Sequence, residues 1–349
     1  MSTTPQTTPA TSTPISAPTR LSRTTGALLG LHAGDSLGAT LEFTPWATIR
    51  SRYPTGLRTI IGGGPFNWPA GHATDDTDLT RAVLLAYRDG SPASGPASDF
   101  DVVRAAADYM LQWHQGAWPG RTLGTPPVDI GNATAIGLNR YRTSRDPRRG
   151  GAGAGQAGNG SLMRCIATGL FQADREKRVK ESMEISAVTH DDRRCTLSCV
   201  AYNEMVFALL CGQTPEEAVE AGLGLVREMS CKPVEEAISH GKELRLQEIA
   251  ERGPSAELPG RAAGYVLESL MLAVAAMLDS RSLVDVLVDV VRVGSDTDTN
   301  AAIAGGLLGV RDGVEALPEE WKEKLQFRIE FEEAALKLVR SQEVEGEVS

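Results

Sequence analysis

Apolar residues recur at helical spacing along most of the chain. Between Asp101 and Gly116 they stand at positions 103, 106, 107, 110 and 111, which is the stripe of an amphipathic helix. We expect Ser98 or Asp99 to cap this helix. The same periodicity predicts helices over 265–278 and 321–339. Helices therefore dominate the predicted secondary structure.

Two further stretches test this assignment. Leu283–Val293 is rich in valine, a β-branched residue that favours strands, but its leucines and several valines share one helical face, so we predict a helix. Thr214, followed by Pro215 and by Glu217 at the third helical position, is the signature of a capped helix start. No alternating strand pattern is found elsewhere. We predict an all-α, single-domain multi-helix bundle.

The two ends of the chain differ from the rest in composition. Residues 1–22 are rich in Thr, Ser and Pro and are expected to form a disordered tail; residues 341–349 are expected to be a disordered acidic tail, and the domain to span 23–340. The first residues lack the apolar core of a secretory signal, and no apolar run approaches the about 20 residues of a membrane span. We therefore expect a cytoplasmic protein that does not contact membranes.

Charge and cysteine usage exclude several classes of protein. The net charge of -10 argues against a nucleic-acid binder, which usually presents a basic face. The five cysteines are an odd number without a C-x-x-C pair, which argues against a disulfide framework and a finger-like zinc site. Cys195 and Cys199 are expected to pack in the core.

Two short acidic motifs carry the candidate chemistry. Thr74-Asp75-Asp76-Thr77-Asp78 and Ser295-Asp296-Thr297-Asp298-Thr299 each stand directly before a helical run. One such motif alone would be read as a helix cap, but capping needs one or two of these residues. Carboxylate and hydroxyl oxygens are the ligands that Mg²⁺ and Mn²⁺ prefer. If the two helix starts meet, a shared metal site is the alternative to capping.

Glycine and proline mark two long loops, over about 55–71 and 142–160. Loops of this length inside a compact domain are often functional. The second, with its Gly/Ala/Arg-rich stretch at 145–158, is either a gate or target contact of the site or a disordered insertion.

An ordered set of motifs resembles the ADP-ribosylglycohydrolase family, in particular the branch typified by dinitrogenase reductase-activating glycohydrolase. The set runs from about Gly26 to Gly309. It consists of Gly26-Ala27-Leu28-Leu29-Gly30, Gly34-Asp35-Ser36-Leu37-Gly38, Glu42-Phe43, Gly62-Gly63-Gly64-Pro65-Phe66, the Thr74–Asp78 motif, Asp129-Ile130-Gly131-Asn132-Ala133-Thr134, Gly158-Asn159-Gly160-Ser161-Leu162-Met163-Arg164, Thr189-His190, and the Ser295–Thr299 motif with Ala302-Ile303-Ala304-Gly305-Gly306.

The resemblance implies an all-α enzyme that binds two Mg²⁺ or Mn²⁺ ions. The implied metal ligands are Thr74, Asp75, Asp76, Asp296, Asp298 and Thr299. Asp129 is the candidate general base, with a loop cap as its alternative role. Glu42 would approach the metals from a mobile loop as a ligand, a base or only a surface acid. Asp35 is expected to brace a helix or loop and not to bind a metal.

The resemblance also implies a set of substrate contacts. Gly131 and Asn132 would offer backbone N–H groups to a diphosphate, Asn159, Gly160 and Ser161 would line the cleft, and His190 would lie beside the substrate. Phe66 and Trp68 would stack on a base or pack in the core. The chain departs from the family at His72-Ala73, where relatives commonly have Glu-Trp, which affects the rim of the cleft more than the ligands.

The expected activity is hydrolysis of the bond between ADP-ribose and a modified target, most simply a protein arginine. The expected partner is ADP-ribose or an ADP-ribosylated protein, and the protein is expected to be a monomer. Alternatives are hydrolysis of serine-linked ADP-ribose or of small conjugates such as O-acetyl-ADP-ribose, and an inactive ADP-ribose-binding or crystallin-like protein. A helical phosphohydrolase using His190-Asp191-Asp192 is disfavoured because no second His-rich motif accompanies this triplet.

Overall fold

The computed structural model describes residues 17–91, 100–254 and 256–348, and within these ranges the fold is all-α with no strand, as the sequence predicts. The α-helices are α1 (Arg20–Gly38), α2 (Trp46–Arg52), α3 (Asp75–Gly90), α4 (Val102–His114), α5 (Asn132–Ser144), α6 (Ile166–Phe171), α7 (Arg175–Ala187), α8 (Arg193–Leu210), α9 (Pro215–Glu228), α10 (Lys232–Glu243), α11 (Leu246–Arg252), α12 (Val266–Leu278), α13 (Leu283–Arg292), α14 (Thr297–Asp312), α15 (Glu319–Lys324) and α16 (Arg328–Val348). Two 3₁₀ turns, η2 (Pro147–Arg149) and η3 (Val314–Ala316), complete the described structure.

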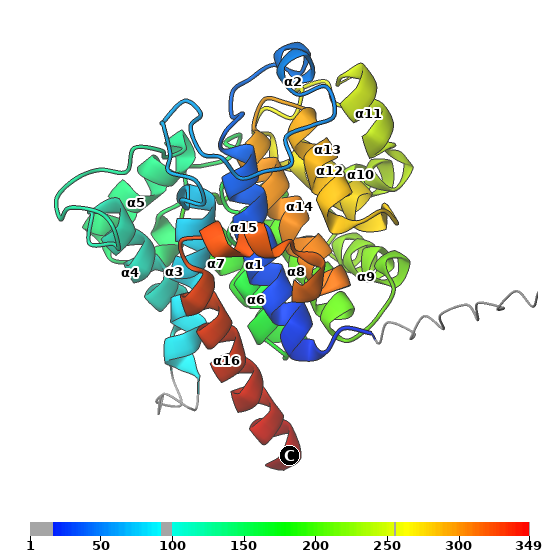
Figure 1. Ribbon diagram of the computed structural model, residues 1–349. Helices are drawn as coiled ribbons and strands as arrows, with labels where there is room; N and C mark the ends of the chain where they lie inside the picture. The colour runs from blue at the N-terminus through cyan, green and yellow to red at the C-terminus, as the bar shows by residue number, and fades with distance from the viewer. Residues whose placement is uncertain (1–16, 92–99, 255, 349) are drawn as a thin grey trace, which may run out of the picture.

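The helix pair α1 and α14 forms the centre of the molecule (Figure 1). Glycines recur every four residues along α1 and face small residues of α14: a Cβ atom on Gly30 would overlap the carbonyl oxygen of Gly305, and one on Gly34 would overlap that of Ala301. The two backbones are therefore in direct contact. This close approach sets the start of α14 beside the end of α1.

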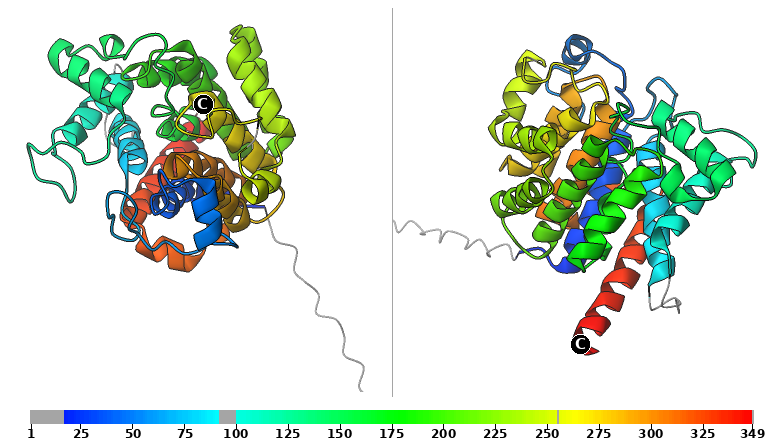
Figure 2. Two further views of the ribbon diagram at one scale, coloured as in Figure 1. Left: turned by 90° about the horizontal axis from the view of Figure 1, so that it is seen from above. Right: turned by 180° about the vertical axis from the view of Figure 1, so that it is seen from behind.

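The other helices surround this pair. Helices α4 and α5 lie on one side of it and α9, α10 and α11 on the other, as both the front view and the view from above show (Figures 1 and 2). Helix α16 projects beyond the body of the molecule at the opposite end from α2 (Figure 1). The core is a single cluster of buried side chains drawn from nearly every helix.

Local signals in the sequence correspond to the observed helices. The valine-rich stretch is helix α13, and Thr214 and Glu217 form the expected capping box at the start of α9. The helix predicted after position 101 is α4, but its cap is Asp101, whose side chain accepts a hydrogen bond from the backbone of Arg104. The two residues we expected as caps, 98 and 99, lie outside the described residues. Cys195 and Cys199 are buried, as predicted.

The single helix predicted over 321–339 is wrong, because the structure has two helices there, α15 and α16. Tertiary hydrogen bonds replace helical ones between them. The backbone N–H of Gln326 donates to Gly71 O, and its side-chain oxygen accepts from Ala73 N. Leu325 and Phe327 are buried on either side. The apolar periodicity continues across this break, so the pattern alone could not reveal it.

The ends of the fold differ in detail from the expected tails. Helix α1 begins at Arg20 and α16 continues to Val348, so residues 20–22 and 341–348 are helical; residues 1–16 and 349 lie outside the described structure. None of the described helices combines the length and the apolar character that a membrane span requires.

Candidate functional site

Helix α3 begins with the first acidic motif. Thr74 caps the helix, accepting a hydrogen bond from Asp76 N and donating to Asp76 Oδ2 at 3.1 Å. The buried Asp35 of α1 accepts hydrogen bonds from Thr74 N, Thr77 N and the Thr77 hydroxyl. Asp35 therefore braces the start of α3, as expected, and ties it to the end of α1.

Helix α14 begins with the second acidic motif, directly after a left-handed residue, Ser295, with φ of 66°. The Ser295 backbone is paired with the segment after α1: Phe43 N donates to Ser295 O at 2.7 Å and Ser295 N to Thr44 O at 3.0 Å. This short antiparallel bridge brings Glu42 to the start of α14.

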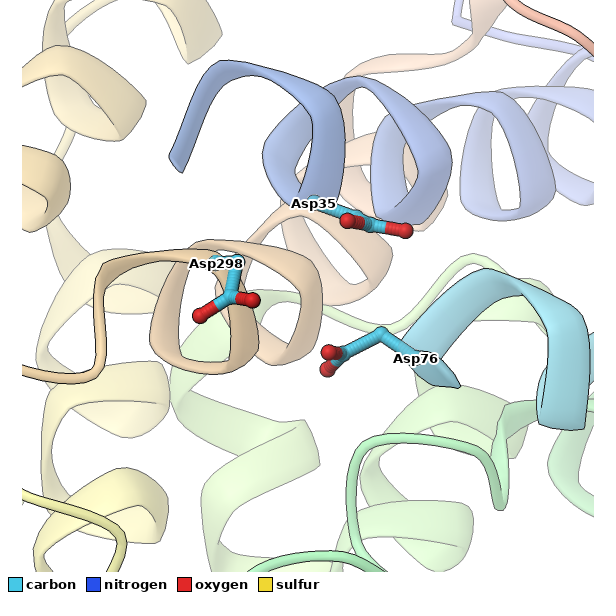
Figure 3. A group of neighbouring side chains, drawn as sticks. All are labelled: Asp35, Asp76 and Asp298. Carbon is cyan, nitrogen blue, oxygen red and sulfur yellow. The ribbon is translucent and has the colours of Figure 1, made fainter. Parts of the chain in front are cut away.

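The two acidic motifs, far apart in sequence, therefore meet. Carboxylate oxygens of Asp35, Asp76 and Asp298 lie within 4.8 Å of one another, and so do those of Glu42, Asp129 and Asp298. Figure 3 shows that the first three come from separate helices, α1, α3 and α14. Thr299 also reaches Asp76, donating to its Oδ2 at 3.4 Å. Both groups of acids are of a kind that could hold a metal ion.

This cluster gathers buried carboxylate oxygens that lack partners. One oxygen on each of five side chains is inaccessible and has no hydrogen-bond donor among the described residues; these are Asp35 Oδ1, Glu42 Oε2, Asp76 Oδ1, Asp129 Oδ2 and Asp298 Oδ1. A buried charged group without a donor is strongly unfavourable. The donor set therefore fits cations, which would satisfy these oxygens.

The crowding of buried carboxylates raises their pKa values. Burial, and then the charges of Asp129, Asp296 and Asp35, raise the pKa of Glu42 to about 9. Burial and the charge of Asp296 raise the pKa of Asp129 to about 6. The pKa values of Asp75, Asp76 and Asp298 also lie well above the usual range, first through burial and then through neighbouring carboxylates. Like charges this close disfavour ionisation unless cations neutralise them.

The cluster forms the floor of a cleft with a volume of about 600 Å³. Most of the side chains and glycines predicted for the site line it, namely Glu42, Asp75, Asp129, Gly131, Asn132, Asn159, Gly160, His190, Asp296, Asp298 and Thr299. The structure thus collects residues from positions 42 to 299 in one place.

Three predicted site residues do not line the cleft. Thr74 and Asp76 are buried beneath it, where Asp76 belongs to the carboxylate cluster and Thr74 orients it. Ser161, predicted as a substrate contact, is also buried, and its hydroxyl accepts a hydrogen bond from Ser186 at 2.9 Å and is approached by the Cys199 thiol. Its side chain braces the cleft wall from behind.

Asn159 links the cleft wall to the second motif. Its amide nitrogen donates to Asp296 Oδ2 at 2.6 Å and to Ser269 Oγ at 3.0 Å. Both amide hydrogens are thereby used, so the side-chain orientation is fixed. Asn159 therefore holds the Asp296 carboxylate in place.

Sequence reasoning missed the residues of the opposite wall. Ala263 and Gly264 line the cleft, on a turn held by the buried Glu268, whose carboxylate accepts hydrogen bonds from Gly260 N and Ala262 N. Asn300 of α14 donates to Ala262 O at 2.9 Å. No motif marks this turn, because the contacts that hold it are made by backbone N–H and C=O groups.

Several loop residues have defined positions. Phe43 is 66% exposed at the cleft and lies 6.4 Å from the Phe66 ring, which in turn neighbours Trp68. The Gly/Ala/Arg-rich loop is anchored beside the cleft, since Gly153 N and Gly155 N donate to the carboxylates of Asp191 and Asp192. These acids are thus engaged with loop backbone.

A larger hollow lies elsewhere in the described structure. It has a volume of about 810 Å³ and lies between α10, α11 and α12. Its lining mixes glutamates with Arg245 and Arg252, and none of the unpaired buried oxygens belongs to it. The buried oxygens without donors, and not the volume of the hollow, therefore select the acidic cleft as the candidate functional site.

Comparisons with known proteins place the chain in a family. The family model for ADP-ribosylglycohydrolase matches residues 16–347. The chain is 30% identical to ADP-ribosylarginine hydrolase Tri1 of Pseudomonas putida, covering 91% of this chain and 78% of that protein. It is 28% identical to the ADP-ribosyl-dinitrogen reductase glycohydrolase of Rhodospirillum rubrum, covering 89% and 92%.

A solved structure, described as an ADP-ribosylglycohydrolase-related protein complex, matches with a TM-score of 0.73 and 26% identity over 92% of this chain and 98% of that one. The fold, the family model and the curated relatives all give the same assignment. The chain belongs to the ADP-ribosylglycohydrolase family.

Proposed function

We propose that this protein hydrolyses the bond between ADP-ribose and a modified arginine, and that it uses two Mg²⁺ or Mn²⁺ ions. The observation that carries the proposal is the set of five unpaired carboxylate oxygens beneath the cleft. Arginine is proposed as the acceptor because the relative from Pseudomonas putida is named an ADP-ribosylarginine hydrolase.

The residues that would hold the metals are those of the two motifs. Asp75, Asp76 and Thr74 would act from α3, and Asp296, Asp298 and Thr299 from the start of α14. Bound divalent ions supply Lewis acidity and a template for the sugar hydroxyls and for water. Hard oxygen donors of this kind favour Mg²⁺ and Mn²⁺ over softer metals.

Asp129 is the proposed general base. Its side chain lines the cleft and one of its oxygens has no partner. The proposed divalent ions would favour its ionised form, which is the form that accepts a proton. Glu42 lies close to Asp129 in the cluster. With the proposed cations bound it would be ionised, and negative charge here favours the oxocarbenium-like state that glycosidic cleavage passes through.

Helix α5 supplies a site for the diphosphate. It begins at Asn132, after Gly131, without a side-chain cap, and both residues line the cleft. The first N–H groups of a helix have no partner within the helix, and they bind anions. Gly131 and Asn132 are exposed, so a phosphate could reach this backbone.

The test is turnover of defined conjugates by the purified protein. Arginine-linked, serine-linked and O-acetyl ADP-ribose are each incubated with Mg²⁺, with Mn²⁺ or with EDTA, and released ADP-ribose is measured. The proposal expects the arginine conjugate to be cleaved fastest and EDTA to stop cleavage. Faster release from another conjugate would reject arginine as the acceptor, and ADP-ribose binding without release from any conjugate would reject the enzyme.

A variant separates the base from the metal site. Asp129→Asn should lower turnover at least about 100-fold, the usual contribution of a general base, while Mn²⁺ still binds. Asp75→Asn should weaken Mn²⁺ binding itself, with the helical content unchanged. Equal loss of metal in both variants would contradict the assignment of Asp129 as a base.

A further inference from the structure

His190 occupies the wall of the cleft between α7 and α8. Its side chain is buried, and its Nε2 edge faces two glycines: a Cβ atom on Gly160 would lie 3.2 Å from Nε2, and one on Gly158 would lie 3.5 Å away. No hydrogen bond to Nε2 is formed by any of the described residues. Nε2 is therefore the ring atom left for a ligand in the cleft.

The other ring nitrogen is engaged by the preceding residue. His190 Nδ1 lies 2.8 Å from the hydroxyl oxygen of Thr189, and Thr189 is fully buried. The same hydroxyl oxygen accepts a hydrogen bond from Arg164 Nη2 at 2.7 Å. The Thr189 hydroxyl thus lies between a guanidinium and an imidazole.

The direction of these hydrogen bonds follows from the chemistry of arginine. A guanidinium can only donate, so the Thr189 hydroxyl accepts from Arg164 and has its own hydrogen left to give. The only other partner recorded for this hydroxyl among the described residues is His190 Nδ1. If Nδ1 carried the proton, the buried hydroxyl hydrogen would have no acceptor, which is unfavourable. Nδ1 must therefore accept, and the ring proton must reside on Nε2.

Arg164 reinforces this arrangement. It is fully buried and donates to backbone oxygens of Gly160 at 2.6 Å and Ile185 at 3.4 Å. It forms no ion pair with a carboxylate of the described residues, so its positive charge acts on the imidazole. Burial first, and then this charge, lower the pKa of His190 to about 3. The ring is therefore neutral at physiological pH.

We propose that Arg164 and Thr189 are positioning residues that hold His190 as the neutral Nε2–H tautomer, so that it acts as a fixed hydrogen-bond donor toward an oxygen of the bound nucleotide. The ligand class, a phosphate or ribose oxygen, rests on the proposed function. The tautomer does not. It follows that His190 cannot serve as the general base, because its only basic nitrogen is occupied by Thr189.

The tautomer is tested by nitrogen NMR of protein labelled with ¹⁵N-histidine, without ligand. The chain has five histidines, and the His190 signal is identified by its loss in His190→Gln. The wild type should show protonated Nε2 and unprotonated Nδ1. Thr189→Ser, which keeps the hydroxyl, should give the same pattern, whereas the isosteric Thr189→Val should lose it. A protonated Nδ1 in the wild type, or an unchanged pattern in Thr189→Val, would overturn the proposal.

The donor role is tested by ADP-ribose binding in the presence of Mn²⁺, measured by calorimetry. Thr189→Val should bind about tenfold more weakly than Thr189→Ser, which is the range for one hydrogen bond. His190→Gln, whose amide reaches the Nε2 position, should bind more tightly than His190→Asn. Equal affinities within both pairs would overturn the donor role.

The NMR and calorimetry experiments also distinguish a failure of this inference from a failure of the proposed function. A protonated Nε2 that depends on the Thr189 hydroxyl would support the positioning roles even if no ADP-ribose conjugate were cleaved. Absence of ADP-ribose binding in every variant and in the wild type would overturn both the donor role and the proposed function, leaving the spectrum to decide the tautomer.

Discussion

Two aspartates that are two residues apart on α3 are buried in very different surroundings. Both oxygens of Asp78 accept hydrogen bonds, each at 2.8 Å, from the indole N–H groups of Trp113 and Trp118. Asp76 has hydroxyl partners on one oxygen and none on the other. Both oxygens of Asp78 therefore have hydrogen-bond donors within the protein, whereas one oxygen of Asp76 has none among the described residues.

The proton affinities show the same difference. Burial raises the pKa of Asp78 to about 7, although the two tryptophans and then the charges of Arg81 and Arg121 oppose the shift. At Asp76, burial is followed by repulsion from Asp35 and Asp75. Donors and positive charges of the protein itself therefore offset the cost of burying Asp78, whereas the Asp76 cluster requires a positive charge from outside the protein. Residue type and burial do not separate the two; hydrogen-bond accounting does.

The largest expected effect is that of Asp298→Asn at the cluster. Removing a carboxylate shared by both acidic groups should lower Mn²⁺ affinity and turnover by more than about 100-fold, exceeding the usual effect of residues that only support a ligand. In EDTA the same variant should melt at a higher temperature than the wild type, because the free energy that is spent on burying this carboxylate or on protonating it is no longer required. Calorimetric Mn²⁺ titration and thermal melts measure both. A lower melting temperature in EDTA would contradict the idea of an uncompensated cluster.

Asn159→Asp should have the next largest effect. It replaces the amide that donates to Asp296 with an acid that repels it, so Mn²⁺ affinity should fall about 10–100-fold, as for other groups that orient metal ligands. Ser269→Ala is the matched control, since it removes the other partner of Asn159 and leaves the Asp296 contact intact. If both variants bind Mn²⁺ as tightly as the wild type, Asn159 does not orient a metal ligand.

The stability of the metal-free protein should fall as pH rises. The pKa of Glu42 is raised from 4.5 to about 9 and that of Asp129 from 3.8 to about 6. A carboxyl group with a raised pKa binds its proton more tightly in the folded protein than in the unfolded one. This proton binding contributes its full stabilisation below about pH 4, and the contribution is lost between pH 4 and 9. Melts in EDTA at pH 5, 7 and 9 should show a decline of several degrees, which saturating Mn²⁺ should reduce most at high pH. An EDTA melting temperature that rises over this interval would contradict the linkage.

The smallest expected effect on metal binding is that of Asp78→Asn. An asparagine side chain can accept a hydrogen bond from one indole N–H, but its amide hydrogens would point at the other indole N–H. The free energy of unfolding should therefore fall by about 2 kcal/mol. Mn²⁺ affinity should change less than about twofold, because Asp78 belongs to neither acidic group. Urea unfolding and calorimetry test the two statements together. A large loss of affinity would show that the Asp78 pocket and the cluster are not separate.

Particular residues show what could be predicted. The apolar periodicity and the paired acidic motifs carry their own signals, so the helical class and the acidic residues of the two helix starts were accessible from the residues themselves, whereas the other residues predicted for the cleft came only from the family resemblance. The direction in which each side chain points could not be predicted from the sequence. Ser161 belongs to the same motif as Asn159, yet only Asn159 faces the cleft, and Asp35 joined the cluster through an oxygen that bracing α3 leaves unused. The helix break at Gln326 depended on the remote residues Gly71 and Ala73.

The sequence by itself determined the local features: helical periodicity, caps such as Thr74 and Thr214, small residues for close packing, and two runs of hard oxygen ligands. Each depends on residues a few positions apart, so each is written in a short stretch of chain. Only the tertiary structure decided which buried polar groups are satisfied, because the donors to Asp78, the Arg164 guanidinium that donates to Thr189 and the neighbours of Asp298 come from segments distant in sequence. Whether a buried polar atom is paired is a property of the whole fold, and here it separates the structural acids from the functional ones.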